Sequence, residues 1–202
     1  MENPVGEYTM TKKQKLLLGI AGFVLVIAAA VIAYNVIAKR SGLQYDMLSL
    51  NKNTDDAAAD KQMAPDFSML DMDGNNLQLS DLIANGKPIV LNFWASWCPP
   101  CKSEMPEFNK VYLEMGDKVQ FVMLDLVDGR QETIQSGTKY IRDNKFVFPV
   151  FFDTKQEGAY SYGIRSIPTT LFIDRDGYVV TGVQGAINEK TLRMGIEMIY
   201  PD

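Results

Sequence analysis

Two cysteines, Cys98 and Cys101, are the residues of this chain best suited to covalent chemistry. They are the only cysteines in the sequence, so they allow one intramolecular disulfide and leave no spare thiol. A dithiol of this spacing can pass electrons to another disulfide, because a thiolate attacks one sulfur and the second thiol resolves the mixed disulfide. The spacing therefore predicts thiol-disulfide exchange, with Cys98 attacking and Cys101 resolving.

Three other uses of such a cysteine pair can be compared with this prediction. A structural crosslink would stabilise little, because so short a closed loop removes little entropy from the unfolded chain. Half of a zinc or copper site would need carboxylates or a second chain as further ligands, since the sequence has no histidine and no other cysteine. Covalent haem attachment would require histidine directly after Cys101, where this chain has Lys102, and is excluded.

The elements around the cysteines should favour a reactive thiolate. The apolar run 89–94, broken only by Asn92, predicts a buried central strand that leads through a short loop into a helix. Cys98 would then lie exposed at the helix N-terminus, where the helix dipole stabilises a thiolate. Pro99 and Pro100 fit the first turn but lack N–H groups. Fewer donors around the Cys98 sulfur favour a reductant over an oxidant.

Residues 65–202 have the pattern of a single α/β domain without repeats. Runs of strand length occur at 67–70, 77–79, 89–94, 119–126, 150–152, 169–173 and 178–183, and helical patterns occur at 130–144 and 188–200. The first two runs flank a turn-rich segment, which predicts a β-hairpin. Ser80 and Asn188 are predicted helix caps.

The N-terminal part divides into a polar flank (1–15), an apolar run (16–38) and a polar linker (39–64). As a helix the apolar run spans about 35 Å, enough to cross a bilayer, and it lacks the amphipathic stripe of a soluble core helix. It therefore predicts a transmembrane anchor, with a cleaved signal peptide as the alternative. Three lysines before the run against Lys39 and Arg40 after it favour a cytoplasmic N-terminus and an extracytoplasmic domain.

Composition excludes several classes of function. The absence of histidine excludes Ser-His and Cys-His catalytic pairs and most catalytic zinc sites. A net charge of −5 without a basic cluster gives no surface for nucleic acid. We therefore expect no metal, no cofactor and no nucleic acid partner, only a redox-active disulfide.

The segment 92–106, NFWASWCPPCKSEMP, resembles the active-site segment of TlpA/ResA-like membrane-anchored thioredoxins. The resemblance covers residues 65–199 and includes GIRSIPTT at 163–170, which is similar to the cis-proline loop of that family. It implies a thioredoxin-like fold with an N-terminal β-hairpin extension, preceded by one transmembrane helix. It further implies that Pro168 follows a cis bond and that Ile167 presents its backbone to an extended substrate. Trp97, next to Cys98, should flank the docking surface. Pro99 and Pro100 should bind the substrate together with Trp97, Ile167 and Pro168.

The resemblance also implies that Glu104 is a catalytic residue that takes part in proton transfer. Thioredoxin carries a buried aspartate in the strand before its cysteines, whereas this chain has Asn92, which cannot shuttle a proton. Family members with asparagine there place a carboxylate three residues after the second cysteine, and Glu104 matches that position on the same helix face as Cys101. The alternative is a solvated acid favoured by the helix dipole.

The resemblance implies a reductase in the cell membrane that acts on oxidised cysteines of exported proteins, among them apocytochrome c. Its electron donor would be a membrane protein of the CcdA/DsbD type. Two alternatives remain open: an oxidase of the same fold, and a tethered, non-catalytic module that binds extended peptides beside Pro168.

Overall fold

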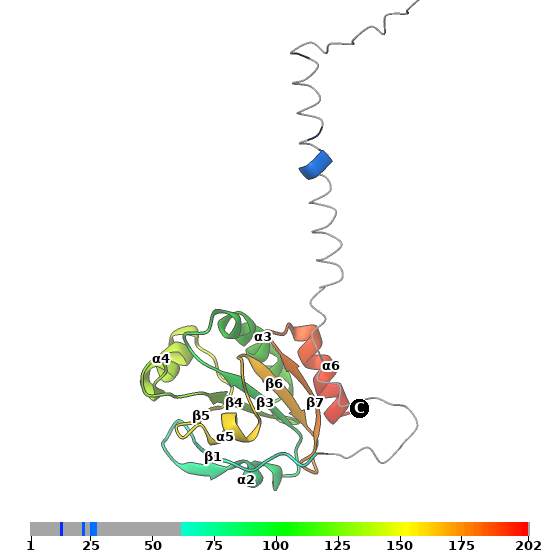
Figure 1. Ribbon diagram of the computed structural model, residues 1–202. Coiled ribbons are helices and arrows are strands. Elements are labelled where there is room, and N and C mark those ends of the chain that lie inside the picture. The colour runs from blue at the N-terminus through cyan, green and yellow to red at the C-terminus, as the bar shows by residue number, and fades with distance from the viewer. Residues whose placement is uncertain (1–12, 14–21, 23–24, 28–61, 202) are drawn as a thin grey trace, which may run out of the picture. The chain divides into compact units, whose positions relative to one another are not determined.

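The computed structural model describes residues 62–201, together with Lys13, Gly22 and residues 25–27 of the N-terminal part (Figure 1). The chain divides into two units, Met1–Gln44 and Tyr45–Asp202. Most of the predicted anchor and linker lies outside the described residues. Among the residues that are described, no helix is both long enough and apolar enough to span a membrane.

A mixed seven-stranded sheet forms the centre of the domain, with strand order β2-β1-β5-β4-β3-β6-β7. The strands are β1 (Ser68–Leu70), β2 (Asn76–Gln78), β3 (Ile89–Trp94), β4 (Gln120–Asp125), β5 (Val150–Phe152), β6 (Thr169–Ile173) and β7 (Val179–Gln184). Strands β3, β4 and β5 are parallel, whereas β6 runs antiparallel to β3. The predicted hairpin is confirmed as the antiparallel pair β1–β2.

Helices cover both faces of the sheet (Figure 1). They are α2 (Leu79–Ile83), α3 (Pro99–Met115), α4 (Ile134–Asn144), α5 (Glu157–Ser161) and α6 (Glu189–Ile199). Because successive side chains of a strand point to opposite faces, the sheet separates two apolar clusters. One cluster packs α3, α4 and α6 against the sheet, and the other packs α2 against the opposite face.

Two predicted helix starts are wrong. The helix predicted from 130 begins at Ile134, because Asp128 accepts the N–H groups of the three residues before the Thr133 cap. Ser80 lies inside α2, which begins after Gln78, and the Ser80 hydroxyl donates to Asp66 instead. The predicted Asn188 cap is confirmed, since its side chain accepts the N–H of Thr191.

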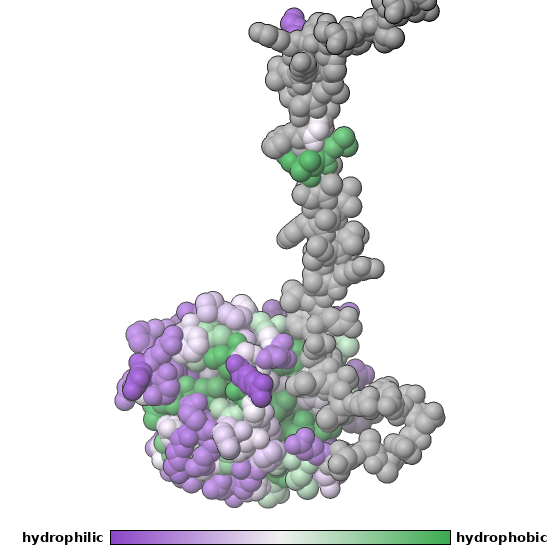
Figure 2. Space-filling model, in the orientation of Figure 1, coloured by the Kyte–Doolittle hydropathy of each residue, from purple (hydrophilic) through white to green (hydrophobic). Residues whose placement is uncertain are grey.

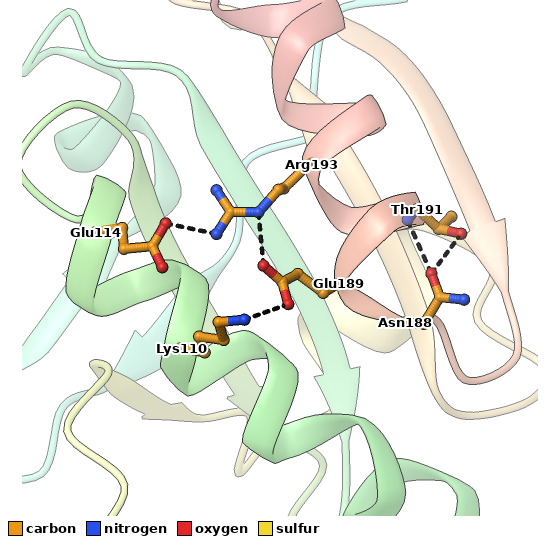
Figure 3. A network of polar contacts seen from close by, with 6 residues as sticks. All are labelled: Lys110, Glu114, Asn188, Glu189, Thr191 and Arg193. Atoms are coloured by element: carbon orange, nitrogen blue, oxygen red, sulfur yellow. Dashed lines mark hydrogen bonds and ion pairs between the residues drawn. The ribbon is translucent and has the colours of Figure 1, made fainter.

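The start of α6 is joined to α3 by charged side chains (Figure 3). Glu189 accepts from Lys110 at 2.7 Å and from Arg193 at 2.9 Å, and Arg193 also reaches Glu114 at 2.5 Å. Exposed ion pairs contribute little individually, but this network links both helices at one point. It therefore helps to fix the loop before α6, which contacts the site described below.

Candidate active site

The cysteine pair lies where strand β3 passes into helix α3. Cys98 is the N-cap of α3 and its sulfur accepts the N–H of Cys101 at 3.2 Å. The two cysteines form a disulfide, with their Cα atoms 5.3 Å apart. Pro99 and Pro100 fill the first two helical positions, as predicted. Cys101 N–H is the only backbone amide that donates to the Cys98 sulfur among residues 62–201.

The expectation that Cys98 is exposed is wrong for this disulfide form. Cys98 is 2% exposed and Cys101 is fully buried, whereas the neighbouring Trp97 is 45% exposed. Burial follows from the position of Cys98 under the loop before β6, because its sulfur lies 3.7 Å from the carbonyl oxygen of Ile167. The surface beside Cys98 is formed in part by Trp97 and Ile167.

A groove of about 430 Å³ opens beside Cys98. Its lining comprises Trp97, Cys98, Pro99, Pro100, Leu126, Asp128, Gln156, Ile164, Arg165, Ser166 and Ile167. The Ile167–Pro168 bond is cis, as the family resemblance implied. Pro168 itself is buried and does not line the groove. Four of the five predicted substrate-binding residues are thus brought together with Cys98.

Glu104 lies on the buried side of α3 and not on its solvated face. The side chain is 2% exposed, which excludes the alternative of a solvated acid. Its carboxylate accepts from Asn92 Nδ2 at 2.9 Å and from the N–H of Ile187, just before α6, at 2.9 Å. Burial raises the pKa of Glu104 to about 7, against the lowering effect of these two hydrogen bonds. Glu104 can therefore exchange a proton near neutral pH.

Sequence reasoning missed a second buried acid, Glu132, which holds the loop before the cysteines. Its carboxylate accepts the Ser96 N–H at 2.7 Å and the Ser96 hydroxyl at 2.8 Å, and Ser136 donates to it from α4. Ser96 stands two residues before Cys98, so these hydrogen bonds fix the loop that leads to Cys98. The signal in the sequence was weak, because Glu132 lies in a stretch that was predicted to be helical.

Asp125 is a third buried acid, at the end of β4 and beside Trp94 of β3. Neither carboxyl oxygen has a hydrogen-bond partner among the described residues. Burial, and next the charge of Glu132, raise the pKa of Asp125 to about 9. Asp125 is therefore protonated at neutral pH in the folded protein.

Asp125→Asn should make stability less dependent on pH. Because folding raises the pKa of this acid from 3.8, the folded state keeps a proton that the unfolded chain releases, and the free energy of unfolding falls as pH rises from about 4 to 9. The asparagine cannot titrate. Relative to the wild type, the variant should gain about 2–4 kcal/mol between pH 5 and pH 8 in urea unfolding of the disulfide form. Asp117→Asn, at an exposed position, is the control, and equal pH slopes for Asp125→Asn and the wild type would contradict this assignment.

The described residues contain no group of three or more acidic or cysteine side chains placed to hold a metal ion. The cysteine pair lies at the start of a helix, and the cis-proline loop beside it leads into an inner strand of a mixed sheet. This combination defines a thioredoxin-like thiol-disulfide oxidoreductase. Such proteins exchange electrons through the cysteine pair itself and need no cofactor. Their substrates are proteins that contain cysteines.

Comparison with known proteins places the chain more narrowly. The AhpC/TSA family matches residues 61–181, and the chain belongs to this family, among its ResA-type members. It is 34% identical to the thiol-disulfide oxidoreductase ResA of Bacillus thuringiensis (strain Al Hakam) over 139 residues, which cover 68% of this chain and 77% of that protein.

Solved structures agree with this assignment. The crystal structure of StoA from Bacillus subtilis is 31% identical, with a TM-score of 0.57 over 66% of this chain and 98% of that one. A thiol:disulfide interchange protein of the thioredoxin family from Chlorobium tepidum TLS is 27% identical, with a TM-score of 0.61 over 71% of this chain and 99% of that one.

Proposed function

We propose that this protein is a membrane-anchored, extracytoplasmic reductase that reduces disulfides of exported proteins. The direction of electron transfer is inferred from the hydrogen bonding of the Cys98 sulfur. This sulfur accepts one backbone N–H, from Cys101, and Pro99 and Pro100 have no N–H to donate. A thiolate with few donors is poorly stabilised, so the dithiol readily gives up its electrons.

The reaction balances without a cofactor. The Cys98 thiolate attacks a substrate disulfide, one substrate sulfur leaves as a thiol, and a mixed disulfide forms. Cys101 then attacks Cys98, which releases the second substrate thiol and restores the Cys98–Cys101 disulfide. Two electrons and two protons pass to the substrate, and a dithiol reductant must supply them again before the next turnover.

The membrane anchor and its orientation are proposed from the sequence. Residues 16–38 are long and apolar enough for a bilayer, and lysines are more frequent on their N-terminal side. Leu25, Val26 and Ile27, described within this run, are helical, exposed and apolar (Figure 2). Residues 65–202 would then lie outside the cytoplasm, where exported proteins acquire disulfides.

By family resemblance, the electron donor is a membrane protein of the CcdA/DsbD type and one substrate is apocytochrome c. An extracytoplasmic reductase needs such a donor, because the cytoplasmic thiol pool lies across the bilayer.

The reduction potential tests the direction of transfer. Equilibration of the full chain with dithiothreitol mixtures should give a potential more negative than about −200 mV, in the range of reducing proteins. A value more positive than about −150 mV would make the protein an oxidase. Reduction of insulin disulfides distinguishes both from a module that only binds peptides, which would have no such activity.

Protease added to intact cells tests the location. We expect residues 65–202 to be digested without lysis, because the domain faces outward. Protection that is lost only after the membrane is broken would overturn the proposed location and leave the redox chemistry unaffected.

A further inference from the structure

The groove beside Cys98 carries two opposite charges on different walls. Asp128 comes from the loop after β4, and Arg165 comes from the loop between α5 and β6. They are the only charged residues in its lining. The intervening surface is largely apolar, formed by Leu126, Ile164 and Ile167 together with the prolines of the cysteine pair.

Sheet order explains why these charges lie on either side of the reactive sulfur. β3 leads to Cys98 and lies between β4 and β6 in the sheet. β4 is parallel to β3, so it ends at the same edge, and β6 is antiparallel, so it begins there. The loops that carry Asp128 and Arg165 therefore approach the Cys98 loop from its two neighbouring strands.

Both charges are available to a ligand. Asp128 is held in place because one of its carboxylate oxygens accepts three backbone N–H groups of its own loop, at 2.8–2.9 Å. These hydrogen bonds lower the pKa of Asp128, so the carboxylate stays charged. Arg165 is exposed and has no hydrogen bond or ion pair with any residue of the described domain. Neither charge is neutralised by the other.

An extended segment that lies along the groove can contact both walls at once. The N–H groups of Ser166 and Ile167 donate to no backbone group of the described residues, so they can bind the main chain of a substrate lying along the groove. A side chain on each flank of the substrate cysteine would then face one of the two walls. The groove can therefore distinguish substrates by the order of acidic and basic side chains around their cysteine.

We infer that the groove selects disulfide-bearing extended segments with one acidic and one basic side chain flanking the cysteine, Arg165 binding the acid and Asp128 the base. The inference rests on the proposed reductase function and adds its substrate class. Arg165 and Asp128 are specificity-determining residues and take no part in the bond-forming steps.

The test uses the reduced full chain in an uncharged detergent and a set of short peptides. Each peptide has one central cysteine, blocked as a mixed disulfide with 2-mercaptoethanol, so that the protein dithiol releases the peptide thiol and 2-mercaptoethanol and becomes the disulfide. The peptides carry Asp then Lys, Lys then Asp, or Gln on both sides of the cysteine. The readout is the second-order rate constant for oxidation of the reduced protein by each charged peptide, relative to that for the Gln peptide, measured separately for each protein variant.

One charge order should exceed the Gln peptide by about threefold to tenfold, and salt should reduce this advantage. Arg165→Glu should abolish or invert the preference, whereas Arg165→Lys should keep it. Asp128→Asn retains an acceptor for the loop N–H groups, and it should lose the part of the preference due to lysine. Arg175→Glu, an exposed arginine in the turn between β6 and β7, is the matched control and should keep the wild-type ratio.

Ratios within about twofold of one another for all peptides would overturn the inference while leaving the reductase intact. An Arg175→Glu effect as large as that of Arg165→Glu would also overturn it, because the preference would then reflect the net charge of the protein. Failure to reduce even the Gln peptide would instead count against the proposed function, so the two failures are distinguishable.

Discussion

Cys98→Ser should abolish disulfide reduction, lowering the rate at least about 1,000-fold, because the serine hydroxyl cannot replace a thiolate as nucleophile. Cys101→Ser should instead retain the first step and stop at the mixed disulfide, since the resolving thiol is gone. The structure favours this division, as Cys98 lines the groove and Cys101 is fully buried behind it. Substrate turnover and non-reducing mass spectrometry measure the two effects.

The control for both variants is Ser161→Ala, which alters an exposed residue at the end of α5 that does not line the groove. Because the chain has no other cysteine, any covalent adduct of Cys101→Ser must be at Cys98. An adduct that forms with Cys98→Ser and not with Cys101→Ser would reverse the roles of the two cysteines. The substrate captured by Cys101→Ser from cells would also test the place of apocytochrome c among the partners.

Glu104→Gln should change both stability and the pH dependence of exchange. Folding raises the pKa of this acid from 4.5 to about 7, so the folded state binds the proton more tightly than the unfolded chain does. The free energy of unfolding contributed by Glu104 therefore falls as pH rises from about 4.5 to 7 and stays low above that range. Relative to the wild type, the glutamine variant should gain about 3 kcal/mol over this interval.

The site can accept glutamine. Asn92 Oδ1 has no hydrogen-bond partner among residues 62–201, so a rotated Asn92 amide can accept from the new side-chain amide. In the reduced protein, loss of the carboxylate should lower the apparent thiol pKa, because a like charge no longer opposes the thiolate, and should slow resolution. Alkylation rate and exchange rate measured against pH report these two changes.

Glu107→Gln, three residues further along α3, is the matched control and should reproduce the wild-type pH profiles. Superimposable profiles for Glu104→Gln and the wild type would remove Glu104 from the mechanism and leave it a buried structural acid. A stability change without a kinetic change would lead to the same conclusion.

Local patterns predicted most of the fold. The apolar run 89–94 is a strand buried on both faces, and the turn-rich segment after β1 forms the hairpin, because each signal lies in a few consecutive residues. Helix α5 was missed because it has only five residues, too few for a periodic pattern. The start of α4 was misplaced because Asp128 binds the backbone that a helix would otherwise use.

Sequence predicted those parts of the candidate site whose chemistry follows from residue type and spacing, such as the cysteine pair. Burial could not be predicted in the same way, because it depends on elements far apart in the chain. Buried Glu104 accepts a hydrogen bond from Ile187, which lies 83 positions away in the sequence. Buried Glu132 accepts one from Ser96, which lies 36 positions away. No local sequence pattern indicates either of these contacts.

The first described residues of the domain, 62–64, extend the sheet beyond its last strand. Val179 N–H donates to Gln62 and Ala64 N–H donates to Gly177, while Met63 forms a bridge with Tyr178. Sequence patterns assigned this segment to the linker. It covers part of the outer edge of β7, where unpaired backbone groups would otherwise attract a strand from another molecule. A fragment made for crystallisation should thus begin at Gln62 or earlier, since one beginning at Pro65 would expose an adhesive edge and tend to self-associate.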